Sequence, residues 1–90
     1  MIQIQHTGIY TICWENDTDC GVLISFYTRQ DAVDYISFLT EKMLFAGGDV
    51  LLRDDVFVSL IDSRDVRWRY WVQENRLTTM DQLERDGRLN

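Results

Sequence analysis

The side chains best suited to binding chemistry lie in the segment 64–76, RDVRWRYWVQENR. If residues 66–73 form a strand, Arg67, Arg69 and Trp71 share one face, because alternate residues of a strand point to the same side. A row of guanidinium and aromatic groups is a platform on which the bases of single-stranded nucleic acid can stack. Arg and Trp are also the residue types most enriched in protein–protein hot spots. The spacing therefore indicates a binding surface and leaves the class of ligand open.

A structural role for these arginines competes with the binding role. Residues 63–90 carry five acids and six bases, whereas residues 1–62 carry ten acids and three bases. The basic segment is close to neutral in itself, so its arginines have acidic groups with which to pair. These are Asp54, Asp55, Asp62 and Asp65. We expect such pairing to be the main use of the arginines.

The segment 28–48, TRQDAVDYISFLTEKMLFAGG, has the pattern of a long helix. Thr28 followed three residues later by Asp31 resembles a capping box, and Gly47 and Gly48 mark the C-terminal end. At 100° per residue, one apolar stripe forms between these ends. Its members are Ala32, Tyr35, Ile36, Leu39 and Met43. The stripe predicts a helix that packs across a sheet.

Two aromatic residues of this helix, Phe38 and Phe45, fall on its polar side, near Asp34 and Glu41. Burying a Phe side chain contributes roughly 1.5–3 kcal/mol, so leaving two of them in water is wasteful unless something covers them. Exposed apolar groups often mark interaction sites. Two alternatives stay open: a protein partner covers the rings, or a C-terminal helix folds back over them.

Catalytic motifs are missing from the sequence. It contains no phosphate-binding glycine loop, no dinucleotide fingerprint, no zinc-protease motif and no nucleophile elbow. Cys13 and Cys20 match no zinc-ligand spacing, and His6 is the single histidine. We expect a protein that is not an enzyme, without cofactor or metal, and with both thiols reduced. A disulfide would need a tight turn at 16–17 that sets Cys13 opposite Cys20.

The formal net charge of −6 disfavours direct binding to nucleic acid and favours a partner with a basic or nucleic-acid-binding surface. The acidic groups form either a solvated surface or a mimic of a phosphate track. No apolar run approaches the roughly 20 residues of a membrane helix, and the N-terminus lacks the pattern of a signal peptide. We expect a cytoplasmic protein that does not contact membranes.

Period-two patterns predict strands on both sides of the helix. Residues 9–14 and 21–27 form one predicted hairpin, residues 49–62 a second, and residues 66–73 a further strand. The segment 21–27 is apolar on both faces, which is typical of a central strand. A short C-terminal helix containing Met80 and Leu83 completes the order ββαβββα. This order predicts a single α+β domain over residues 1–90, with a mostly antiparallel sheet of about five strands and one long helix packed across it.

Size, acidity and the missing motifs together predict a small non-enzymatic protein that binds a protein partner. The residues expected to carry the binding are Asp34, Phe38, Glu41, Phe45, Arg67, Arg69 and Trp71. A narrower expectation, by analogy of composition, is an inhibitor of a nucleic-acid-handling host complex of the phage or mobile-element counter-defence type, which includes anti-CRISPR proteins. The alternatives are a single-stranded nucleic-acid-binding module that uses residues 66–73, and a homo-oligomeric structural subunit or homodimer.

Overall fold

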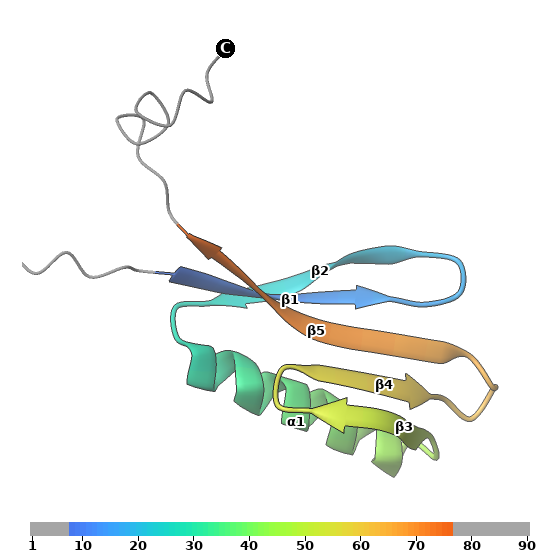
Figure 1. Cartoon of the computed structure of the whole chain (residues 1–90). Coiled ribbons are helices and arrows are strands. Elements are labelled where there is room, and N and C mark those ends of the chain that lie inside the picture. The colour runs from blue at the N-terminus through green and yellow to red at the C-terminus, as the bar shows by residue number, and fades with distance from the viewer. Residues whose placement is uncertain (1–7, 77–90) are drawn as a thin grey trace, which may run out of the picture.

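The computed structural model describes residues 8–76, which form one antiparallel sheet and one helix. The strands are β1 (Gly8–Glu15), β2 (Cys20–Phe26), β3 (Asp49–Asp54), β4 (Phe57–Ile61) and β5 (Arg67–Arg76), and helix α1 (Arg29–Phe45) follows β2. Helix α1 lies along one side of the sheet (Figure 1). The predicted α+β class, with a five-stranded antiparallel sheet and one long helix, is therefore confirmed. The predicted C-terminal helix lies outside the described residues.

Strand β5 joins the two hairpins into one sheet. The strand order is β2-β1-β5-β4-β3, so the last strand of the described chain sits at the centre. Trp71 of β5 lies opposite Cys13 of β1 on one side and opposite Phe57 of β4 on the other. The side chains of β5 alternate as predicted: Trp68, Tyr70 and Val72 pack toward the core under α1. Arg67, Arg69 and Trp71 therefore belong to the opposite face.

Helix α1 begins and ends where the sequence predicts. The hydroxyl of Thr28 accepts a hydrogen bond of 3.2 Å from the backbone N–H of Asp31, which satisfies one free donor of the first turn. At the other end, Gly47 has φ +92° and the Gly48 N–H donates to the Met43 carbonyl at 2.9 Å. A Cβ at Gly48 would lie 2.6 Å from the Ile61 carbonyl oxygen, so only glycine fits there.

The core lies between α1 and the central strands. Its buried residues are Ile12, Ala32, Ile36, Val58 and Leu60. The predicted apolar stripe of the helix supplies two of them, and its other members, Tyr35, Leu39 and Met43, pack against them. Thr40 is also fully buried, and its hydroxyl donates a hydrogen bond of 2.8 Å to the Ile36 carbonyl. Burial of the polar side chain is therefore compensated within the helix.

The predicted central place of the segment 21–27 is wrong. Strand β2 pairs only with β1 and forms one edge of the described sheet. Its apolar side chains are exposed rather than sandwiched: Val22 is 64%, Leu23 46% and Ile24 41% exposed. An apolar pattern on both faces shows that a strand can be buried on both faces. It does not show which strands will pair with it, and here β5 pairs with β1 rather than with β2.

Candidate protein-binding surfaces

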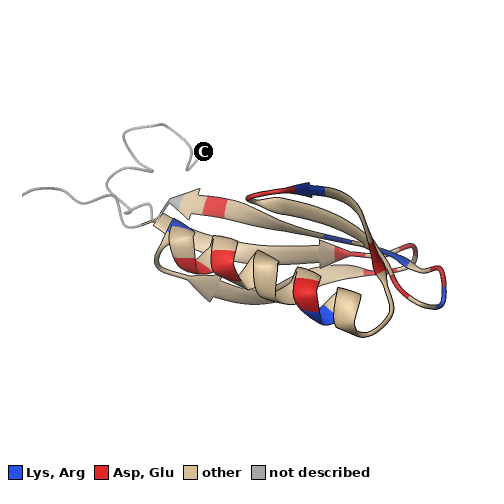
Figure 2. Ribbon diagram, turned by 90° about the horizontal axis from the view of Figure 1, so that it is seen from below, with Lys and Arg blue, Asp and Glu red and all other residues tan. Residues whose placement is uncertain are grey.

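The outer side of α1, which points away from the sheet, carries four of the predicted binding residues. We call Asp34, Phe38, Glu41 and Phe45 the outer helix face; all four are exposed. Phe38 is 53% and Phe45 97% exposed, which are high values for large apolar side chains. The acidic residues of α1 follow the outward side of the helix (Figure 2). The chain thus displays two aromatic rings among carboxylates on one rigid element.

Neighbouring side chains contact the ring of Phe38 and restrict its position. Its centroid lies 5.6 Å from that of Tyr35, whose ring in turn lies 5.5 Å from Phe26 of β2. The ammonium of Lys42 lies 5.2 Å from the centroid of the Phe38 ring. A cation–π contact at an exposed site contributes about 0.5–1 kcal/mol. These contacts restrict the rotamers of Phe38 while leaving half of its surface free.

The polar members of the outer helix face are less constrained. Asp34 accepts a hydrogen bond of 2.8 Å from the side-chain amide of Gln30, one turn earlier in the helix. Among the residues the structure describes, Glu41 forms no ion pair. The alternative in which Met80 and Leu83 cover Phe38 and Phe45 lies outside the described residues. The carboxylates of Asp34 and Glu41 are both exposed, as long-range attraction of a basic partner requires.

Arg67, Arg69 and Trp71 lie on the sheet face away from α1, and the structure brings them together as the strand pattern predicts. Arg69 forms an ion pair with Glu15 of β1, which lies directly opposite it in the register. Trp71 is half-buried, beside the buried thiol of Cys13. Two of the three groups therefore already have partners within the fold.

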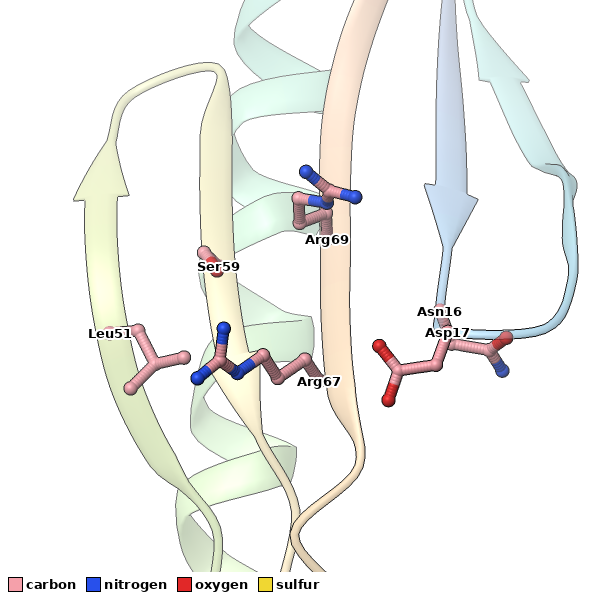
Figure 3. Close-up of a pocket in the computed structure, with 6 residues that line it drawn as sticks. All are labelled: Asn16, Asp17, Leu51, Ser59, Arg67 and Arg69. Atoms are coloured by element: carbon pink, nitrogen blue, oxygen red, sulfur yellow. The ribbon is translucent and has the colours of Figure 1, made fainter.

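Arg67 is the freest of these three groups. It lines a hollow of about 200 Å³ on the open sheet face. Figure 3 shows its guanidinium extending from β5 across β4 toward Leu51, with Asp17 of the β1–β2 turn on the other side of β5. The other residues that line the hollow are Asn16, Ser59 and Arg69. In the described part of the chain, Arg67 forms no ion pair.

The predicted pairing of arginines with aspartates is right at one position and wrong at another. Arg64 pairs with Asp62 at 3.5 Å. Arg69, in contrast, pairs with Glu15 rather than with any of the four predicted aspartates. The sequence could not reveal this partner, because it comes from the first hairpin and is brought close only by the pairing of β1 with β5.

Asp62 organises the turn between β4 and β5, a role the sequence did not single out. Its carboxylate accepts hydrogen bonds from the N–H groups of Arg64 at 2.8 Å and Val66 at 3.0 Å, and from the Trp68 indole at 3.0 Å. These hydrogen bonds lower the pKa of Asp62 to about 2, and the bond from Trp68 has the largest effect. The DSRD sequence of this turn was the available signal, since Asp side chains commonly accept from backbone N–H groups two residues on.

The two cysteines lie apart in the register. Glu15 lies opposite Cys20, and Val22 lies opposite Cys13, so the tight turn that a cross-hairpin disulfide needs is not formed. Both thiols are free, with Cys13 buried and Cys20 exposed. Within residues 8–76, no three His, Cys, Asp or Glu side chains gather closely enough to hold a metal ion. The same residues contain no helix with the length and apolarity needed to cross a membrane.

No family model, curated protein or solved structure matches this chain.

Proposed function

We propose that this protein acts by binding a protein partner, without catalysis, through the outer helix face. The observation that carries the proposal is the exposure of Phe38 and Phe45, at 53% and 97%, on a helix whose other side already supplies the core. Burying a Phe side chain contributes roughly 1.5–3 kcal/mol. A partner that covers both rings would therefore gain enough free energy to offset part of the entropy lost on association.

The two rings have different roles in this proposal. Phe38 is restrained by Tyr35 and Lys42, so little side-chain entropy is lost when a partner covers it, and it serves as the central anchor. Phe45 ends the helix and is almost fully exposed, which suits a ring that inserts into a pocket of the partner.

The charges around the rings define the kind of partner. Asp34 and Glu41 are exposed beside the aromatic residues, and the chain as a whole carries a formal charge of −6. Such a surface attracts a basic partner over a distance and disfavours acidic ones. We therefore propose a partner with a basic surface, and place the encounter in the cytoplasm, where the exposed Cys20 thiol would stay reduced.

In its narrower form, the proposal is that the partner's basic surface is one that handles nucleic acid. A small acidic protein that occupies such a surface would inhibit it, as a counter-defence protein of a phage or mobile element does. The acidic excess and the small size support this form. It predicts that the protein displaces nucleic acid from its purified partner in a competition assay, and that displacement weakens as salt rises.

The test compares two double variants as bait in affinity capture from host lysate, read by quantitative mass spectrometry. Phe38→Ala/Phe45→Ala removes both anchors, and Leu51→Ala/Leu52→Ala removes two apolar residues, 50% and 62% exposed, from the far edge of the sheet. We expect a partner that the wild type and the Leu variant retain and that the Phe variant loses. Truncating a central anchor should cost about 2 kcal/mol or more of binding with the purified partner. Equal retention by both variants would refute the proposal.

A further inference from the structure

The hollow on the open face of the sheet contains two opposite charges that do not pair with each other. Arg67 of β5 and Asp17 of the β1–β2 turn both line this hollow, whose volume is about 200 Å³. Figure 3 shows the Arg67 guanidinium extending over β4, whereas the Asp17 carboxylate lies on the other side of β5. Within residues 8–76, neither group forms an ion pair. The hollow therefore has a positive end and a negative end.

The backbone around the hollow sets the positions of both charges. The side-chain oxygen of Asn16 accepts hydrogen bonds from the N–H groups of Thr18 at 2.9 Å and Asp19 at 2.7 Å, which orders the turn that carries Asp17. Arg67 belongs to β5, which pairs with β4 on one side and with β1 on the other. A ligand that reaches both charges must therefore span one to two strand spacings, about 5–10 Å.

The charges define the class of ligand. An anion alone would meet the Asp17 carboxylate and the net charge of −6 of the chain, and a cation alone would meet Arg67 and Arg69. A ligand that carries both a carboxylate and a cationic group avoids both penalties. The hollow, at about 200 Å³, is smaller than the roughly 300–1,000 Å³ of pockets that enclose a small molecule. Two side chains presented by an extended peptide need no such enclosure.

The spacing of an extended peptide matches the hollow. Residues i and i+2 of an extended chain point to the same side and lie about 7 Å apart, within the span between the two charges. The hydroxyl of Ser59, which lines the hollow, is a further donor for a carboxylate. Leu51, which is 50% exposed at the same hollow, is available to the methylene groups of the peptide.

We propose that the hollow binds an extended segment of a protein partner in which an acidic and a basic residue lie two positions apart. The carboxylate of the segment pairs with Arg67, and its cationic group pairs with Asp17. The outer helix face lies on the other side of the sheet, so this site does not rest on the function proposed above.

The experiment titrates blocked pentapeptides into the full chain labelled with ¹⁵N and follows its backbone amide signals by NMR. The probe is a peptide of alanine with glutamate at the second position and lysine at the fourth. We expect saturable shifts at Arg67 and Asp17 and none along α1. Three control peptides carry glutamate and lysine at adjacent positions, two glutamates, or two lysines, and each should bind at least about fivefold more weakly. Absence of saturable binding, or a control that binds as tightly as the probe, would overturn the proposal.

Charge variants identify the residues that bind the probe. Arg67→Glu and Asp17→Lys should each weaken binding by at least about fivefold, because each sets like charges together. The double variant should restore it, because the extended peptide then binds in the reverse direction. Arg64→Gln, at an exposed arginine outside the hollow, is the matched control and should bind as the wild type does. Circular dichroism checks that each variant is folded. Failure of the double variant to restore binding, or equal weakening by the control, would exclude the bridging arrangement.

The variant Phe38→Ala/Phe45→Ala separates this site from the outer helix face. It should bind the probe with the affinity of the wild type. If it loses the probe instead, the peptide binds at the outer helix face, and the proposal for the hollow fails while the proposed binding surface stands.

Discussion

Arg69 of β5 forms an ion pair with Glu15, the residue directly opposite it on β1. The pair connects β1 and β5 on the sheet face away from α1. Its side chains are 53% and 35% exposed, so its contribution to stability is small, about 0–1 kcal/mol. Its main effect is electrostatic, because the carboxylate neutralises the guanidinium at the middle of the row Arg67, Arg69, Trp71.

This neutralisation leads to a prediction about nucleic acid. We expect no binding of a labelled single-stranded oligonucleotide, measured by fluorescence anisotropy, even at low salt. Within the row Arg67, Arg69, Trp71, Arg67 alone forms no ion pair, and on a chain of net charge −6 this single guanidinium is too little to overcome general repulsion. Micromolar or tighter binding that falls steeply with salt and is lost in Arg67→Ala/Arg69→Ala would instead establish the basic strand as the functional site.

A second prediction concerns acid stability and Asp62. Its pKa is about 2 in the folded chain, below the ordinary value of 3.8, chiefly because of the hydrogen bond from Trp68. A lowered pKa contributes stability that is complete above about pH 4 and is lost as pH falls through about 2. Urea unfolding followed by tryptophan fluorescence should show Asp62→Ala to be less stable than the wild type at pH 7. The difference should shrink toward pH 2.

The helix and its core stripe could be predicted from the sequence because their determinants are local. Thr28 and Gly47 lie at the ends they specify, and the spacing of Ala32, Ile36 and Met43 is set by the helix itself. The alternation in β5 is equally local. What these patterns report is the conformation of a segment and which side of it is buried.

The place of each strand in the sheet could not be predicted in the same way. Strand β2 is at an edge because β5 pairs with β1 rather than with β2. The residues 20–26 do not determine which strand β5 pairs with. The ion pair between Arg69 and Glu15 could not be predicted for the same reason, because it depends on the pairing of β1 with β5. The position of Phe38 and Phe45 on the outer side of α1 could be predicted, because the spacing of residues along a helix is a local signal. The edge position of β2 could not be predicted, because its apolar pattern suits a central strand equally well.

The cysteines provide a third prediction. Cys20 is exposed, whereas Cys13 is buried, and burial raises the pKa of its thiol. Alkylation without reductant, followed by intact mass measurement, should add one label quickly to the native protein and two labels in denaturant. Cys20→Ser should remove the fast label. If no label is added even in denaturant, the thiols are oxidised, and the expected reduced state is wrong.

The last prediction tests whether the rings of the outer helix face are free to bind. Phe38 is half-exposed and Phe45 is almost fully exposed, whereas Ile36 on the opposite side of the helix is 1% exposed. We expect Ile36→Ala to lower the free energy of unfolding by about 2–5 kcal/mol, because it leaves a cavity in the core. Phe45→Ala should change it by no more than about 0.5 kcal/mol, as surface substitutions usually do. Phe38→Ala should cost less than about 1.5 kcal/mol, because only its contacts with Tyr35 and Lys42 are lost. Urea unfolding of the three variants gives these values directly. If both Phe variants instead lose roughly 3–5 kcal/mol, the rings are core residues, and the interface has to be sought at Arg67, Arg69 and Trp71.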